Sequence, residues 1–109
     1  MKVLSQWIGG ELVIVLAGEL DHNAAKSTMR QIDDAIDEQL PKRCVLDMCA
    51  VDFMDSSGIA VILRAQKHLD GIGGRLRVEN CTGQALRVLD AAGVGKLVTV
   101  CAKTEGSRT

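Results

Sequence analysis

The chain has 109 residues, of which 47% are hydrophobic and 25% are charged, and its formal net charge is −1. This composition is typical of a soluble globular protein, and the near-neutral charge argues against a nucleic-acid partner or a membrane surface, since both attract basic clusters. We expect one domain over residues 1–109, located in the cytoplasm. No segment resembles a signal peptide, and the longest apolar run is too short to cross a bilayer.

The few cysteine, histidine and aromatic residues argue against several kinds of ligand site. The four cysteines form no CxxC pair and the chain has only two histidines, so we expect free thiols, no metal site and no bound cofactor. One Trp, one Phe and no Tyr argue against stacking platforms for bases or sugars. The core must therefore be aliphatic.

A β-hairpin is predicted at the start of the chain. Residues 2–8 and 11–17 are β-like, and Gly9-Gly10 between them tolerates the positive φ angles that a two-residue turn requires. The second segment is continuously apolar, which predicts a strand covered on both faces.

Three helices are predicted after the hairpin. In the first, which Pro41 ends, apolar residues recur at spacings of three or four; they are Ala25, Met29, Ile32, Ile36 and Leu40. The second helix spans about residues 57–70 and ends at the glycine-rich stretch 71–74. The third runs to about Ala92 and has Thr82 as its predicted N-cap residue.

Three more strands alternate with these helices, at residues 44–48, 75–79 and 97–102. Residues 75–79 alternate charged and apolar side chains, so one face of that strand should contact solvent. The order β-β-α-β-α-β-α-β predicts an α/β fold with a small, mixed, mostly parallel sheet that helices cover at least in part.

The stretch Asp55-Ser56-Ser57-Gly58, at the start of the second predicted helix, is the strongest functional candidate. Asp and Ser are favoured N-cap residues, because their side-chain oxygens accept hydrogen bonds from unpaired backbone N–H groups. Simple capping is therefore one interpretation of the stretch. One cap needs only one such residue, however, so the second serine is surplus, and it lies at the positive end of the helix.

Two covalent roles fit this stretch less well. A nucleophile elbow requires GxSxG and a nearby histidine, but the first glycine is missing and both His22 and His68 are expected on the surface, so no enzyme activity is predicted. Ser56 after Asp55 matches the phosphopantetheine attachment site of acyl carrier proteins. Carriers, however, have Leu where Ser57 stands, and they are built from helices.

A phosphoacceptor role fits the electrostatics of the stretch. A phosphoserine adds about −1.5 to −2 charges, and a helix N-terminus stabilises negative charge. The fold should therefore tolerate both forms, whereas a partner docked on this patch would face a poorly desolvated charge. The stretch thus predicts a two-state binding switch without catalytic machinery of its own.

Four segments resemble the STAS domain: LAGELDHNAA (16–25), VLDMCAVDFMDSSGIAVIL (45–63), GGRLRV (73–78) and ALRVLDAAGVGKLV (85–98). Within that family they resemble most closely the anti-sigma factor antagonists of the sporulation sigma-factor switch. The resemblance implies the STAS fold, a small sheet with helices largely on one face.

The resemblance also implies a mechanism. Ser57, the second serine of the motif, would accept a phosphate from ATP through an anti-sigma factor that is itself a serine kinase. The unphosphorylated form would bind this kinase and free the sigma factor, phosphorylation would end the binding, and a phosphatase would reset it. Asp21 of the GELD motif would lie beside Ser57 on the kinase-facing surface, although Asp21 equally fits a helix-initiating role.

Around Ser57 we predict a partner-binding patch of Asp21, Met54, Asp55, Ser56 and Gly58. Met54 is expected at the exposed rim of this patch, because thioethers adapt to docking surfaces, and Phe53 is expected in the core. Two other roles stay open. One is an accessory STAS subunit of a stress-signalling complex or of an ABC or anion transporter, without a phosphate cycle; the other is a carrier protein that uses Ser56.

Overall fold

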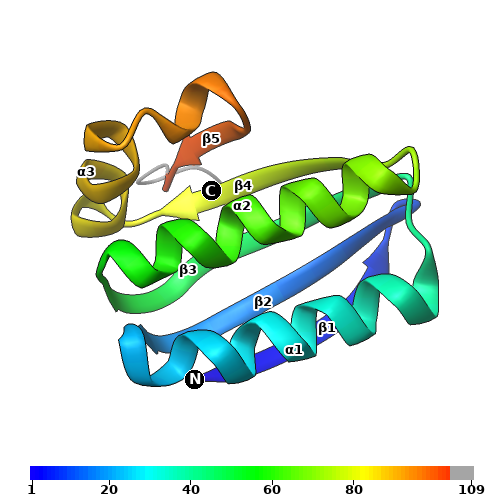
Figure 1. The fold of residues 1–109 in the computed structure, drawn as a ribbon, viewed down its shortest axis with the longest axis horizontal. Coiled ribbons are helices and arrows are strands. Elements are labelled where there is room, and N and C mark those ends of the chain that lie inside the picture. Colours follow the sequence, from blue (N-terminus) through cyan, green and yellow to red (C-terminus); the bar gives the residue numbers. More distant parts are fainter. Residues whose placement is uncertain (104–109) are drawn as a thin grey trace.

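The computed structural model describes residues 1–103, which form a five-stranded sheet, three α-helices and a short 3-10 helix (Figure 1). The strands are β1 (Lys2–Ile8), β2 (Glu11–Leu20), β3 (Arg43–Met54), β4 (Arg75–Cys81) and β5 (Thr99–Ala102). The helices are α1 (His22–Gln39), α2 (Ser56–Gly71), α3 (Gly83–Ala91) and the 3-10 helix η1 (Val94–Lys96). The predicted order of strands and α-helices is confirmed.

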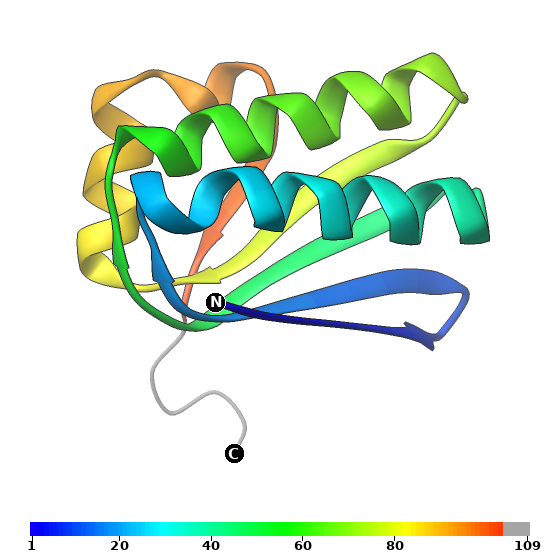
Figure 2. The same ribbon diagram turned by 60° about the horizontal axis from the view of Figure 1, so that its bottom comes forward.

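The strands lie in the sheet in chain order, β1-β2-β3-β4-β5, with β1 and β2 antiparallel and all later neighbours parallel. Right-handed crossovers that all step in one direction bring their helices to the same face of the sheet. Figure 2 shows α1 and α2 side by side above the sheet, with α3 at one end of it. The predicted mixed, mostly parallel sheet with helices largely on one face is confirmed.

One-sided cover by the helices explains the burial of β2. Leu12, Ile14 and Leu16 are buried, whereas Val13 and Val15 point to the other face and are only half-buried. The prediction that this strand is covered on both faces is wrong. Figure 2 shows that no helix of residues 1–103 lies on the other face of the sheet.

The core is an aliphatic layer between the sheet and the helices, as the composition predicts. Its largest fully buried side chains are Leu12, Ile14, Leu16, Leu20, Ile32, Ile36, Leu46, Met48, Met54, Ile62, Leu69 and Leu89. Full burial of one such side chain contributes about 1.5–3 kcal/mol, so this layer holds the helices against the sheet. The two aromatic residues, Trp7 and Phe53, are both partly exposed.

Local turns and caps were predicted with mixed success. Gly9 and Gly10 have φ angles of 58° and 82°, as the two-residue hairpin turn requires. Leu40 does not lie on the buried stripe of α1; it is 63% exposed, because it closes that helix in the left-handed conformation with a φ of 46°. Thr82 is the N-cap residue of α3, but its side chain makes no capping hydrogen bond and its hydroxyl is buried without a partner.

The cysteines are free thiols with little reactivity where they are buried. Burial raises the pKa of Cys44 to about 12 and that of Cys81 to about 11, so both stay protonated at neutral pH. Cys49 and Cys101 are exposed. Among residues 1–103, no three His, Cys, Asp or Glu side chains gather in a metal-binding group. In the same range, no helix has the length and apolarity that a membrane crossing needs.

Candidate functional site at the starts of two helices

The strands β2 and β3 end next to each other, and α1 and α2 begin directly after them. Leu20 and Met54, the last residues of these strands, are register partners, and the Asp55 N–H donates to the Leu20 carbonyl at 3.3 Å. Both helix N-termini therefore lie at the same edge of the sheet, as Figure 1 and Figure 2 show. This edge brings together the GELD and DSSG segments, which are far apart in the sequence.

Asp21 begins α1 as its N-cap residue. Its Oδ1 accepts a hydrogen bond from the Ala24 N–H at 3.0 Å, and its side chain is half-buried. The helix-initiating role considered for Asp21 is therefore present in the structure. Its contact with a partner stays a prediction.

Asp55 joins the two helix N-termini through one carboxylate. Its Oδ1 accepts from the Ser57 N–H at 2.8 Å and caps α2, while its Oδ2 accepts from the His22 N–H, in the first turn of α1, at 3.1 Å. The hydrogen bond from the Ser57 backbone, with a further one from His22, lowers the pKa of Asp55. Asp55 is thus a fixed anion that ties α1 to α2.

Ser56 and Ser57 occupy the first two positions of α2 and differ in exposure. Ser56 is exposed and Ser57 is half-buried. Ser57 lines a depression of about 490 Å³ between the first turns of α1 and α2, together with side chains of α1 that include His22 and Lys26. Because Asp55 supplies the cap, neither serine hydroxyl is needed to begin the helix.

The Met54 side chain packs directly beneath Gly58 in the first turn of α2. A Cβ added at Gly58 would overlap the Met54 side chain and would lie 3.2 Å from a methyl group of Leu20. Gly58 is buried and Met54 is 0% exposed. The prediction that Met54 lies at an exposed rim is wrong, because the end of β3 turns Met54 inward against the first turn of α2. Contact of Met54 or Gly58 with a partner stays a prediction.

Phe53, and not Met54, is the exposed residue at the end of β3. It is 42% exposed, and the prediction that it belongs to the core is also wrong. Neighbouring residues of a strand point to opposite faces, so burial of Met54 turns Phe53 outward. An aromatic side chain therefore stands on the surface four positions before Ser57.

Gln84, at the start of α3, is a site residue that the sequence did not reveal. Its side-chain Oε1 accepts from the Met54 N–H at 2.9 Å, and its Nε2 donates to the Met54 carbonyl at 2.8 Å. The pairing of β3 with β4 runs from Arg43 to Asp47, so Met54 lies beyond it. Gln84 supplies there the two hydrogen bonds that a neighbouring strand would otherwise make. A glutamine near a helix start carries no sequence signal for such a contact.

A second polar cluster ties α1 to α2 away from Ser57. His68, expected on the surface, is half-buried, with its Nδ1 2.9 Å from Asp33 Oδ1 and its Nε2 2.7 Å from Asp37 Oδ1. Ionised carboxylates only accept hydrogen bonds, and both ring nitrogens can donate only when the imidazole is protonated, so this arrangement favours the protonated form. These hydrogen bonds, the one with Asp33 foremost, raise the pKa of His68.

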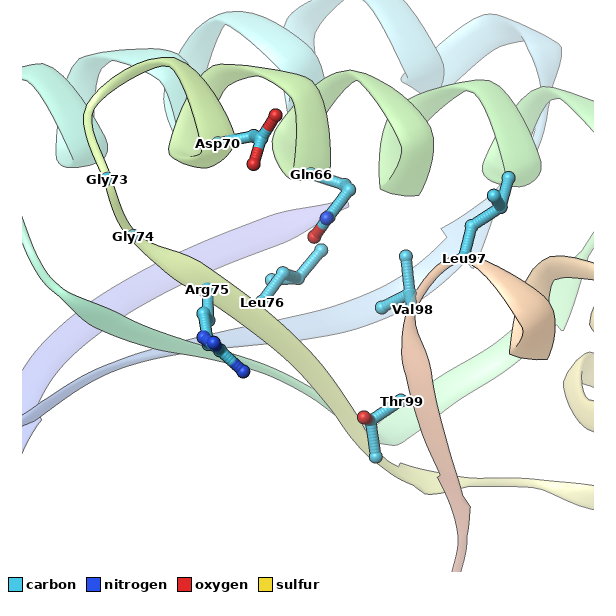
Figure 3. Close-up of a pocket in the computed structure, with 9 residues that line it drawn as sticks. All are labelled: Gln66, Asp70, Gly73, Gly74, Arg75, Leu76, Leu97, Val98 and Thr99. Carbon is cyan, nitrogen blue, oxygen red and sulfur yellow. The ribbon is translucent and has the colours of Figure 1, made fainter.

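A separate depression of about 430 Å³ lies between α2, β4 and the segment that leads into β5 (Figure 3). Gln66 comes from α2, while Leu76, Leu97 and Val98 supply its apolar side chains. None of the predicted site residues lines it. It lies along the C-terminal half of α2, whereas Ser57 lies in the first turn, so it is no part of the site described above.

The strand order, the one-sided helices and the serine pair at the start of α2 together define the class of protein. The chain belongs to the STAS domain family, whose model matches residues 3–107. It is 35% identical over 91 residues to the anti-sigma F factor antagonist of Paenibacillus polymyxa, a match that covers 84% of this chain and 78% of that protein. The resemblance that the sequence motifs indicate is confirmed.

Two solved structures that carry the name SpoIIAA are similar over nearly the whole chain. The anti-sigma factor antagonist SpoIIAA in its unphosphorylated form has a TM-score of 0.76 at 27% identity, and the match covers 95% of this chain and 90% of that chain. SpoIIAA in the phosphorylated form has a TM-score of 0.68 at 27% identity, over 95% of this chain and 93% of that chain. A related protein thus adopts this fold with and without a phosphate.

Proposed function

We propose that this protein is an anti-sigma factor antagonist that a phosphate on Ser57 switches off. The unphosphorylated form binds an anti-sigma factor that is also a serine kinase, and this binding frees the sigma factor. The kinase then transfers phosphate from ATP to Ser57 and the complex dissociates, until a phosphatase restores the hydroxyl. The protein is a cytoplasmic binding module in this cycle, and not its enzyme. The relatives that carry the name antagonist, and the two forms of SpoIIAA, support this proposal.

The observation that carries the proposal is the difference in role between Asp55 and Ser57. Asp55 already accepts the hydrogen bond that caps α2, so the Ser57 hydroxyl is left over from helix formation. Ser57 belongs to the first turn of α2 and lines a depression that Lys26 also lines. A phosphate attached there would lie near the N-terminus of α2, whose cap Asp55 already occupies, and beside a cationic side chain.

The docking surface that we propose consists of Asp21, Phe53, Ser56 and Ser57. Phe53 takes the role that was expected of Met54, because exposed aromatic side chains are frequent anchors of protein interfaces. Phosphorylation would add about −1.5 to −2 charges at the centre of this surface. A partner would then have to remove water from that charge without a matching cation, so the complex weakens.

Modification mapping tests the proposal directly. Cleavage of the natively isolated protein after Arg43 and Arg64 releases one peptide, residues 44–64, whose hydroxyl side chains are Ser56 and Ser57 alone. Phosphate on Ser57 is expected. Phosphopantetheine on Ser56 would indicate the carrier protein instead, and a peptide that stays unmodified through growth and starvation would indicate the accessory subunit.

Binding of the kinase in the presence of ATP provides the second test. The Ser57→Ala variant is expected to stay bound, because it cannot be phosphorylated, whereas wild type dissociates as phosphate is incorporated. Ser56→Ala is the control for the phosphorylated position: it removes the neighbouring hydroxyl, and whatever its affinity before ATP is added, it should still dissociate as phosphate is incorporated at Ser57. Loss of binding by Ser57→Ala before ATP is added, with the fold intact, would refute the switch as proposed.

A further inference from the structure

Gln84 holds the backbone of the residue that precedes the cap of α2. Its side-chain amide pairs with both polar groups of Met54, at 2.9 Å to the N–H and 2.8 Å to the carbonyl. On the other edge of β3, Met54 is the register partner of Leu20 in β2. The backbone at the end of β3 is therefore held from both sides: Gln84 takes both polar groups of Met54, and the next N–H, that of Asp55, donates to the Leu20 carbonyl of β2 at 3.3 Å.

Two connections carry this restraint from Met54 to Ser57. Asp55 follows Met54 directly, and its carboxylate accepts from the Ser57 N–H at 2.8 Å. The Met54 side chain lies under Gly58, where an added Cβ would overlap it. A rotation of the Met54 backbone would therefore displace both the Asp55 cap of α2 and the side chain that packs beneath Gly58.

We propose that Gln84 is a positioning residue for the phosphoacceptor, an inference that rests on the proposed function of Ser57. Phosphoryl transfer depends on an in-line approach of the attacking oxygen, and small misplacements of that oxygen lower the rate strongly. Gln84 restricts the orientation of the first turn of α2, and so it fixes the direction in which the Ser57 hydroxyl points. The docking surface itself does not include Gln84, so the rate of transfer depends on this residue more than the affinity does.

The variant Gln84→Glu tests this with a change of almost no volume. The carboxylate that it introduces would still accept from the Met54 N–H, but when ionised it could not donate to the Met54 carbonyl and would repel it. A protonated carboxyl group would donate again, and an unperturbed glutamic acid has a pKa of about 4.3. The defect should therefore appear at pH 7 and disappear at about pH 3.5. Gln66→Glu is the matched control, because Gln66 lines the depression of Figure 3.

Two readouts separate this inference from the proposed function. Without any kinase, NMR is expected to show the Met54 and Ser57 amides of Gln84→Glu exchanging roughly five- to tenfold faster than in wild type at pH 7, with wild-type protection restored at about pH 3.5. With the anti-sigma factor serine kinase and ATP at pH 7, kcat for phosphate transfer should fall about tenfold while KM stays within about twofold.

The results distinguish the positioning role of Gln84 from the proposed phosphorylation of Ser57. Unchanged Ser57 protection in Gln84→Glu, or a defect that persists at about pH 3.5, would overturn the positioning role while leaving phosphorylation of Ser57 untouched. Altered amides together with a wild-type kcat would overturn it as well. Absence of phosphate transfer to wild type would instead refute the proposed function, and the kinetic part of this inference with it.

Discussion

The contact between Gly58 and Met54 predicts that the smallest possible substitution in the DSSG motif destabilises the fold. In Gly58→Ala, the new methyl group would overlap the Cγ and Sδ atoms of Met54, which is 0% exposed and has no solvent into which to swing. Overpacking of a core costs about 1–3 kcal/mol, whereas alanine gains up to about 1 kcal/mol over glycine in a helix. The steric cost exceeds the gain, so we expect a net loss of about 1–2 kcal/mol in the free energy of unfolding.

Urea unfolding followed by circular dichroism measures this loss. A decrease of about 1–2 kcal/mol should lower the midpoint by about 1 M urea. The control is Gly71→Ala in the same helix, where a Cβ meets nothing within 4 Å, so that its stability should be unchanged or higher. Met54→Ala alone should cost about 2–5 kcal/mol, and the double variant should recover about 1–2 kcal/mol relative to the sum of the single changes. Additive effects, or a Gly58→Ala variant as stable as wild type, would refute the packing argument.

Three further outcomes are expected. His68→Gln should be less stable than wild type, most clearly at pH values below about 6.5, and the difference should shrink as pH rises through the raised pKa of His68. Urea midpoints measured between about pH 5.5 and 8.5 check this, and a difference that stays constant with pH would contradict it. Lys26→Gln should raise the second pKa of phospho-Ser57 in ³¹P NMR titrations by a few tenths of a unit, whereas the control Lys67→Gln on α2 should leave it unchanged. Phe53→Ala should weaken kinase binding about tenfold in calorimetry without lowering thermal stability, and equal affinity would remove Phe53 from the docking surface.

The order of elements could be predicted because each signal for it is local. The Gly9-Gly10 turn, the apolar spacing of α1 and the stop at Pro41 each depend on neighbouring residues, and all three are found in the structure. The open face of the sheet could not be predicted in the same way. A continuous apolar run such as residues 12–17 looks the same whether helices cover one face or both, and only the direction of all the crossovers decides between them.

The predicted burial of Phe53 and exposure of Met54 are reversed in the structure, and the reason lies in the geometry of β3. Near its end β3 does not alternate regularly, since Met48, Val51 and Met54 are buried at spacings of three. The pairing with β2 shifts register between Gly18 and Glu19, opposite this part of the strand. A bulge of this kind changes which side chains point inward, and a sequence pattern with period two cannot locate it.

In the candidate site, too, features that depend on neighbouring residues could be predicted, and contacts between distant residues could not. The stretch Asp55-Ser56-Ser57-Gly58 was identified from its own neighbourhood, because cap residues and helix starts have a local signature, and the family resemblance then singled out Ser57. The hydrogen bond from the His22 N–H to Asp55 and the two between Gln84 and Met54 each join residues about thirty positions apart. They depend on parallel strands ending together and on α3 lying against the end of β3, so they become visible only once the chain is folded.

The bonds of Asp55 also determine where a phosphate on Ser57 would lie. The Ser57 and His22 N–H groups are both occupied by the Asp55 carboxylate, so a phosphate over the helix axis would have to displace a bound anion and face its repulsion. The depression beside Lys26 offers a cation and no such competition. We therefore expect the phosphate to leave the cap of α2 intact and to lie between the first turns of α1 and α2. In that position, phosphorylation would change the charge of the proposed docking surface and leave the fold beneath it unchanged, so only a partner would respond to it.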